Sequence, residues 1–236
     1  MVMRVESFTV DSFVHVVKRG GRGMDITKNK SDQWRFVRLL FYMNNEFADE
    51  NWERRTKKQG MFSWPVDLPT RRPLVKILAY CLMPNHFHLI LKEIKDGGVS
   101  LFMKKLGESM TRYFNEKYQE KGSIFQGAYK SRTIDSDEYL RYVGAYVMAK
   151  NTFELYPKGG LEGAMKNFDD AWKWATDYPF CSLADYSGGR EYSVILDKDL
   201  LGEIFTSAKK FKDFCQNCKF TDVRHPSNLR IDIGLV

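Results

Sequence analysis

An α+β fold is predicted by the order of strand-like and helix-like segments in the first 140 residues. Short apolar runs typical of strands occur at 13–18, 74–82, 86–93 and 124–133. Amphipathic segments typical of helices separate the first run from the second and the third from the fourth, at 33–47 and 100–121. The order strand, helix, strand, strand, helix, strand is that of the ferredoxin-like split βαβ plan, an antiparallel sheet with both helices on one face.

Local signals mark where these segments begin and end. Gly20 and Gly21 stop the first strand, and Ser31 with Asp32 is a typical cap for the first helix. Ser100 precedes the second helix, and Gly122 ends it. The stretch 45–73 is different, because it is charged, contains three prolines and lacks a sustained hydrophobic period. We interpret it as a long loop or insertion.

A further helix is predicted after the fourth strand. The acidic, cap-like run 135–138 precedes an amphipathic segment that extends to Asn151. Tyr139, Tyr142 and Tyr146 share one face of it, since they are spaced by three and four residues. The six-element plan leaves one sheet face open, and this helix is the natural candidate to cover it and to bring a tyrosine there.

The third predicted strand contains two of the four histidines of the chain, His86 and His88. Side chains alternate along a strand, so both imidazoles point to one face, while Phe87 and Leu89 point to the other. Two imidazoles on one face can supply two nitrogen ligands to a metal ion, and such a site needs only a third ligand from elsewhere. An isolated pair of this kind is more often structural, bonded to backbone or solvent.

Composition sets broad limits. The chain has 236 residues, 43% of them hydrophobic, which is enough for one domain with a core and an extension. Its net charge of +7 suggests a polyanionic partner, although ordinary solubility explains the charge equally well. No apolar stretch approaches the roughly 20 residues that span a bilayer, and the first residues lack a signal-peptide pattern. We expect a cytoplasmic protein without membrane contact, with four reduced cysteines, including the Cys215–Cys218 pair.

Five segments together resemble a known family. In chain order they are VVKRG, AYCLMPNHFHLILK, SIFQGAYKSR, DSDEYLRYVGAYVMAKN and DYPFCSLADY. They follow the pattern of the insertion-sequence-200-like transposases and more narrowly resemble the REP-associated tyrosine transposases, which are single-tyrosine HUH endonucleases. The resemblance covers roughly residues 10–187. We therefore assign 1–187 to a catalytic domain and 188–236 to a C-terminal extension, which its amphipathic pattern predicts to be helical.

The resemblance implies a metal-dependent site with a tyrosine nucleophile. His86 and His88 would bind Mg²⁺ or Mn²⁺, and Tyr146 would attack DNA, with Tyr142 as the fallback one turn away. The family has an amide ligand four residues after its tyrosine, where this chain has Lys150. A shift of one residue gives this role to Asn151, which we take as the third ligand; without it the site would be weakened. The proline that follows in the family is missing here.

The same resemblance implies DNA as the partner. Lys130 and Arg132 alternate on the fourth strand, with Gln126 just upstream, and this mixture suits contacts to phosphates and bases. A solvated edge strand explains these residues equally well. The function implied is cleavage and rejoining of single-stranded or hairpin DNA through a 5′-phosphotyrosine intermediate. A non-catalytic nucleic-acid-binding protein and an unrelated metal-dependent hydrolase are the alternatives. Some members of the wider class exchange the tyrosine helix within a homodimer, and others act as monomers.

Overall fold

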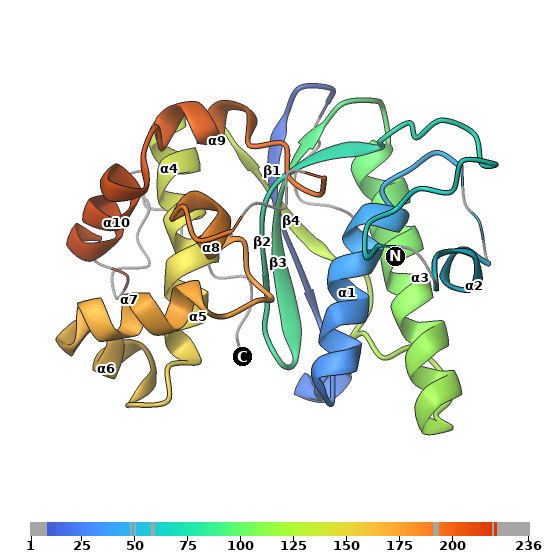
Figure 1. The fold of residues 1–236 in the computed structure, drawn as a ribbon, viewed down its shortest axis with the longest axis horizontal. Helices are drawn as coiled ribbons and strands as arrows, with labels where there is room; N and C mark the ends of the chain where they lie inside the picture. Colours follow the sequence, from blue (N-terminus) through green and yellow to red (C-terminus); the bar gives the residue numbers. More distant parts are fainter. Residues whose placement is uncertain are drawn as a thin grey trace.

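The sheet has the predicted topology. The computed structural model describes residues 9–47, 49, 51–57, 60–190, 194–218 and 220. Four strands form one antiparallel sheet in the order β2 (Val75–Leu82), β3 (His86–Glu93), β1 (Phe13–Arg19) and β4 (Lys130–Ile134) (Figure 1). With α1 between β1 and β2 and α3 between β3 and β4, this is the ferredoxin-like arrangement, and the α+β prediction is confirmed.

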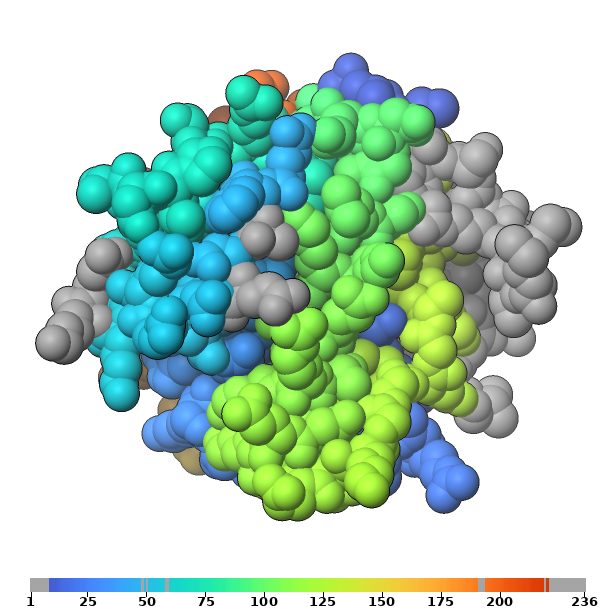
Figure 2. All heavy atoms as spheres, turned by 90° about the vertical axis from the view of Figure 1, so that its right-hand side faces the viewer, coloured from blue at the N-terminus to red at the C-terminus, as the bar shows by residue number. Residues whose placement is uncertain are grey.

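Two helices cover one face of the sheet. They are α1 (Lys30–Tyr42) and α3 (Gly98–Tyr118), which lie side by side in Figure 1. Phe87, Leu89 and Leu91 of β3 are fully buried in the core beneath them. Figure 2 shows the outer side of this layer, with α3 running down its centre. Phe87 and Leu89 therefore point to the helix-covered face and away from the face of His86 and His88, as predicted.

The caps of these helices differ from the sequence prediction. Asn29, not Ser31, is the N-cap of α1, and its side chain accepts hydrogen bonds from the backbone N–H groups of Ser31 and Asp32. Helix α3 begins at Gly98, two residues before Ser100, and its N-cap has no side-chain bond. Asp32 is buried and instead accepts hydrogen bonds from side chains of α3, which ties α1 to α3.

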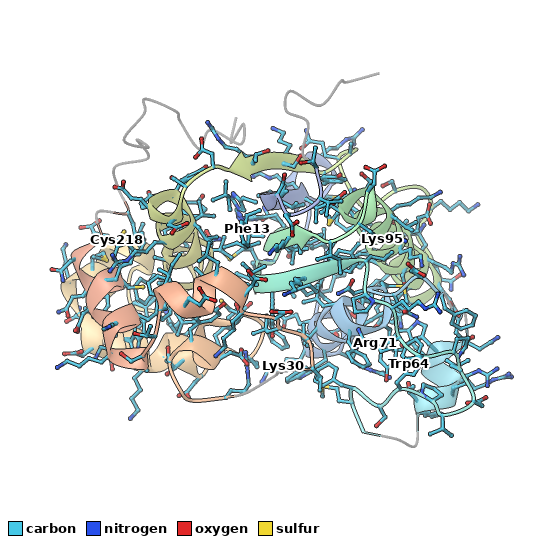
Figure 3. The ribbon with its side chains drawn as sticks, turned by 90° about the horizontal axis from the view of Figure 1, so that it is seen from above. Phe13, Lys30, Trp64, Arg71, Lys95 and Cys218 are labelled. Atoms are coloured by element: carbon cyan, nitrogen blue, oxygen red, sulfur yellow. The ribbon has the colours of Figure 1, made fainter. Side chains whose placement is uncertain are left out.

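The stretch 45–73 packs against α1. It contains a short helix, α2 (Trp52–Thr56), which the sequence pattern did not indicate. Trp52 stacks on Tyr42 with 4.3 Å between ring centroids. The Arg71 guanidinium lies 3.8 Å from the Phe41 ring centroid, and Figure 3 shows Arg71 and Trp64 in the same corner of the molecule. Only one short 3₁₀ turn, Gly21–Gly23, interrupts the path from β1 to α1 among the described residues.

A helical layer covers the opposite sheet face, as expected for the tyrosine-bearing segment (Figure 1). It begins with α4 (Asp137–Ala145), whose N-cap Ser136 accepts a hydrogen bond from the Tyr139 N–H group. The other elements of the layer are the π turn η2 (Tyr146–Lys150), α5 (Asn151–Glu154), α6 (Gly160–Lys166), α7 (Phe168–Thr176), α8 (Leu183–Tyr186), α9 (Asp199–Ile204) and α10 (Ala208–Asn217).

The predicted C-terminal extension contributes helices to this layer. Leu201 of α9 and Phe211 of α10 are fully buried in the same apolar cluster as the tyrosine helix. Cys215 is buried in the last turns of α10, and all four cysteines are free thiols. The boundary at 187 stays a prediction. Among the described residues, every helix is too short or too polar to cross a bilayer.

The π turn changes the register of the tyrosine helix. The backbone N–H group of Asn151 bonds to the carbonyl of Tyr146, five residues earlier, whereas an α-helical bond spans four. One extra residue is therefore accommodated in this turn. As a result, Asn151 occupies the place that the fourth residue after Tyr146 would have in an uninterrupted α-helix.

This register leads to a deletion test. Removing Lys150 lets the turn close as an α-helix, so Tyr146 and Asn151 keep their directions, and we expect the free energy of unfolding to fall by less than about 1 kcal/mol. Removing the exposed Arg141 instead rotates residues 137–140 by about 100° relative to the rest of the helix, which takes the buried Leu140 out of the core and costs several kcal/mol. Urea denaturation measures both. Equal destabilisation by the two deletions would contradict the register.

Candidate active site

Three histidines, rather than the two expected, lie together on the sheet face below the tyrosine helix. His86 and His88 come from β3, and His15 comes from the adjacent strand β1. In the antiparallel register Val17 pairs with His88 and Arg19 with His86, so His15, two residues from Val17, points to the same face. His15 Nε2 lies 2.9 Å from His88 Nδ1, at hydrogen-bond distance. His15 was not predicted from the sequence, although the alternation of side chains along β1 could have indicated that it lies on one face with Val17 and Arg19.

Tyr146 packs directly on this group. Its ring centroid lies 5.8 Å from that of His88 and 6.1 Å from that of His15, with both contacts edge to face. Tyr146 is 7% exposed, while Tyr142 is half-buried one turn earlier. The helix thus brings Tyr146 to the histidines, as expected; its role as nucleophile stays a prediction.

Burial and neighbouring cations keep the imidazoles neutral. Desolvation lowers the pKa of His86 to about 4, with help from the positive charges of Arg19 and Lys150. Desolvation, with Arg132 nearby, lowers the pKa of His15 to about 3, and burial lowers the pKa of His88 as well. Neutral imidazole is the form that ligates metals, so the site is in the correct protonation state at pH 7.

Asn151 fits the part of a third ligand better than Lys150. Asn151 is 1% exposed, and neither its amide oxygen nor its amide nitrogen has a hydrogen-bond partner among the described residues. Such a buried amide costs about 1–3 kcal/mol, which coordination would offset. The Lys150 ammonium instead forms a salt bridge with Glu154, at 2.6 Å, and lies 4.8 Å from the Tyr146 ring centroid.

The donor set suits a divalent ion. Thr152, next to Asn151, contacts Cys81, and Cys81 is the register partner of His88, so Asn151 is held on the histidine side of the sheet. Among the described residues, His, Cys, Asp and Glu form no group of three arranged to hold a metal. A site here would combine two imidazole nitrogens with the amide oxygen, a mixture that Mn²⁺ accepts more readily than Mg²⁺.

Cationic side chains lie on the same sheet face as the histidines. Lys130 and Arg132 stand opposite Val17 and His15 in the β1–β4 register, which places them on the histidine face at the sheet edge. Arg19, which sequence reasoning missed, lies on the same face of β1 opposite His86.

Gln126 lies outside β4, in the turn before it. Its backbone N–H group bonds to the Arg19 carbonyl, and its side chain is exposed. The predicted fourth strand, 124–133, therefore began too early, because Gly127 adopts a φ of 138° that breaks the extended path. Only Lys130 onward pairs continuously with β1.

The depressed histidine pKa values make stability depend on pH. The unfolded chain binds protons near the ordinary histidine pKa of about 6.5, whereas folded His86 and His15 bind them only near pH 4 and pH 3. Stability is therefore complete above pH 6.5 and declines as the pH falls toward 4. We expect urea denaturation to show a flatter decline for the double variant His15→Gln/His86→Gln than for the wild type. Parallel curves would contradict the burial of neutral imidazoles.

Comparisons with known proteins gave a family match over part of the chain and similar solved structures. No curated protein matches the chain. One similar solved structure is that of a REP-associated tyrosine transposase bound to a REP hairpin; it shares 11% identity and covers 85% of this chain and 93% of that chain, with a TM-score of 0.43. A family model described as "Transposase IS200 like" matches residues 70–150.

The matched segment includes His86, His88 and Tyr146 and ends one residue before Asn151. The predicted resemblance to the insertion-sequence-200-like transposases is thus confirmed, with residues 70–150 as the part of the chain that carries the family pattern.

Proposed function

We propose that this protein is a transposase that cleaves and rejoins single-stranded or hairpin DNA through a 5′-phosphotyrosine intermediate and depends on Mg²⁺ or Mn²⁺. The observation that carries the proposal is the packing of Tyr146 on the His15–His88 pair, beside the positive charges of Arg19, Arg132 and Lys150. The family match over the same segment supports DNA as the substrate.

The chemistry requires one nucleophile and one leaving group. The Tyr146 oxygen attacks a phosphorus atom of the DNA backbone, and the bond from phosphorus to the deoxyribose 3′-oxygen breaks. The products are a 5′-phosphotyrosine link and a free 3′-hydroxyl group. Since the phosphodiester bond energy is retained in the link, a 3′-hydroxyl of another strand reverses the step without ATP.

The side chains at the site each support this step. His86, His88 and Asn151 would hold the divalent ion, which when bound polarises the phosphoryl oxygens. Arg19 and Arg132 place positive charge beside the histidines, where a phosphate would be oriented for in-line attack. The ammonium group of Lys150, 4.8 Å from the Tyr146 ring centroid, stabilises negative charge that develops on the phenol.

The site is formed by one chain. Tyr146 contacts histidines of its own subunit, so catalysis does not require exchange of the tyrosine helix between two protomers. This favours action in cis over the homodimer that the resemblance also allows.

A second candidate function is nucleic-acid binding without catalysis. It is favoured by the low exposure of Tyr146, 7%, and by the replacement of the family's proline after the amide position. The cationic side chains on the histidine face would serve such a protein equally well.

One assay separates these functions. The protein is incubated with a labelled DNA hairpin that carries single-stranded flanks, with Mn²⁺ or with a chelator, and resolved under denaturing conditions. A metal-dependent covalent adduct supports the transposase. Salt-sensitive binding without an adduct supports the binding protein, and the absence of any binding favours an unrelated hydrolase.

Substitution of the tyrosines tests the nucleophile. Tyr146→Phe removes only the hydroxyl group, so we expect it to eliminate the adduct while the circular dichroism spectrum and hairpin affinity stay unchanged. Tyr142→Phe is the matched control, one turn away on the same helix, and should retain the adduct. Peptide mapping of the trapped product gives an independent check, and a DNA-linked peptide with Tyr142 modified would show that the nucleophile was misassigned.

Salt dependence tests the cationic edge. Each phosphate contact contributes about −0.7 to the slope of log affinity against log salt for single strands. We expect Lys130→Ala and Arg132→Ala each to weaken hairpin binding and to reduce the slope by roughly one contact. Lys166→Ala, at an exposed lysine of α6 paired with Glu162, is the control. Slopes equal to the wild type in both edge variants would remove β4 from the DNA interface.

A further inference from the structure

His15 occupies a position that the proposed chemistry does not use directly. It lies on the central strand β1, is 1% exposed, and has no access to a substrate on the surface. Its ring stacks on that of His88, with 5.2 Å between centroids and 14° between planes. It also contacts the Tyr146 ring edge to face. His15 therefore lies behind both groups that are expected to act on DNA.

The contact between His15 and His88 constrains one nitrogen of each ring. A distance of 2.9 Å between His15 Nε2 and His88 Nδ1 is that of a hydrogen bond, which holds one proton between the two nitrogens. His88 Nδ1 is thereby occupied, and Nε2 is the only nitrogen of His88 left for another partner. A neutral imidazole carries a single N–H group, so a proton on Nδ1 leaves the Nε2 lone pair available.

We propose that His15 is a positioning residue for His88: it accepts a hydrogen bond from His88 Nδ1–H, fixes the orientation of that ring, and so presents His88 Nε2 to the metal ion. The inference rests on the proposed function, since it concerns the same metal site. Partners of this kind behind a ligating histidine typically change metal affinity by about 10–100-fold when they are removed.

His86 provides an internal comparison. Its Nδ1 lies 2.6 Å from the side-chain oxygen of its neighbour Asn85, an acceptor that fixes the same Nδ1–H form. Both expected histidine ligands are therefore held at Nδ1, so Nε2 is the nitrogen that each would present to a metal ion. A buried imidazole holds His88, and a partly exposed amide holds His86.

The test compares two replacements of one residue. His15→Phe keeps an aromatic ring of similar size but removes the acceptor, whereas His15→Gln keeps a side-chain amide oxygen near the position of Nε2. Mn²⁺ is titrated into each full-length, metal-free protein without DNA, and binding is measured by calorimetry. We expect His15→Phe to bind Mn²⁺ about 10–100-fold more weakly than the wild type and His15→Gln to recover most of that loss. Hairpin affinity without metal should be the same in all three proteins.

A spectroscopic measurement covers the case in which His15→Phe does not fold. Long-range ¹H–¹⁵N spectra of the wild-type protein saturated with Mg²⁺ report which nitrogen of His88 carries the proton. A proton on Nδ1 supports the proposal, and a proton on Nε2 overturns it. A folded His15→Phe with wild-type Mn²⁺ affinity also overturns it.

The outcome is separable from that of the proposed function. A wild-type protein that binds Mn²⁺ but never forms a DNA adduct contradicts the proposed transposase activity. In that case the Mn²⁺ affinities of the His15 variants still decide the role of His15. Wild-type affinity in His15→Phe, together with an adduct in the native protein, rejects the role of His15 alone.

Discussion

The pairing of β1 with β3 is the constraint on which the rest of the structure depends. Because side chains alternate strictly along both strands, one register sends Phe87 and Leu89 into the core under α1 and α3 and sends His15 and His88 to the other face. A slip of one residue would turn the imidazoles into that core and turn its apolar side chains toward the tyrosine helix. The same apolar packing that stabilises the sheet therefore fixes the direction of the histidines.

The proposed chemistry makes two demands on the tyrosine helix that an ideal α-helix does not meet with this sequence. Tyr146 has to face His15 and His88, and a side chain that can ligate a metal ion has to follow Tyr146 on the same side of the helix. In a regular helix that donor would be Lys150, whose ammonium group is a poor ligand. The π turn absorbs one residue and gives the position to Asn151, at the cost of a less regular helix with an unpaired buried amide. Single π turns inside α-helices occur frequently at functional sites.

Much of this arrangement follows from patterns along the chain, and the remainder depends on pairing between distant segments. His86 and His88 are recognisable as a same-face pair because alternation is a local property of one strand. His15 is not recognisable in this way, because it joins the pair only when β1 pairs with β3. His15 and His88 are 73 residues apart in the sequence. The π turn has no local signature either, because α and π turns differ by one hydrogen bond that tertiary packing selects. The strand β4 begins later than predicted because Gly127 has a positive φ. The strand-like composition of 124–133 gives no sign of that backbone conformation.

The C-terminal helices pack against the tyrosine helix and hold it in place. Helix α4 contacts both α9 and α10. At Gly144 the helices approach so closely that a Cβ atom would lie 2.9 Å from the Leu201 side chain, and the Arg141 guanidinium lies 4.3 Å from the Phe214 ring centroid. Separating α4 from these helices would expose the fully buried Leu201 and Phe211 to water. The residues after the family pattern thus stabilise the helix that leads into Tyr146.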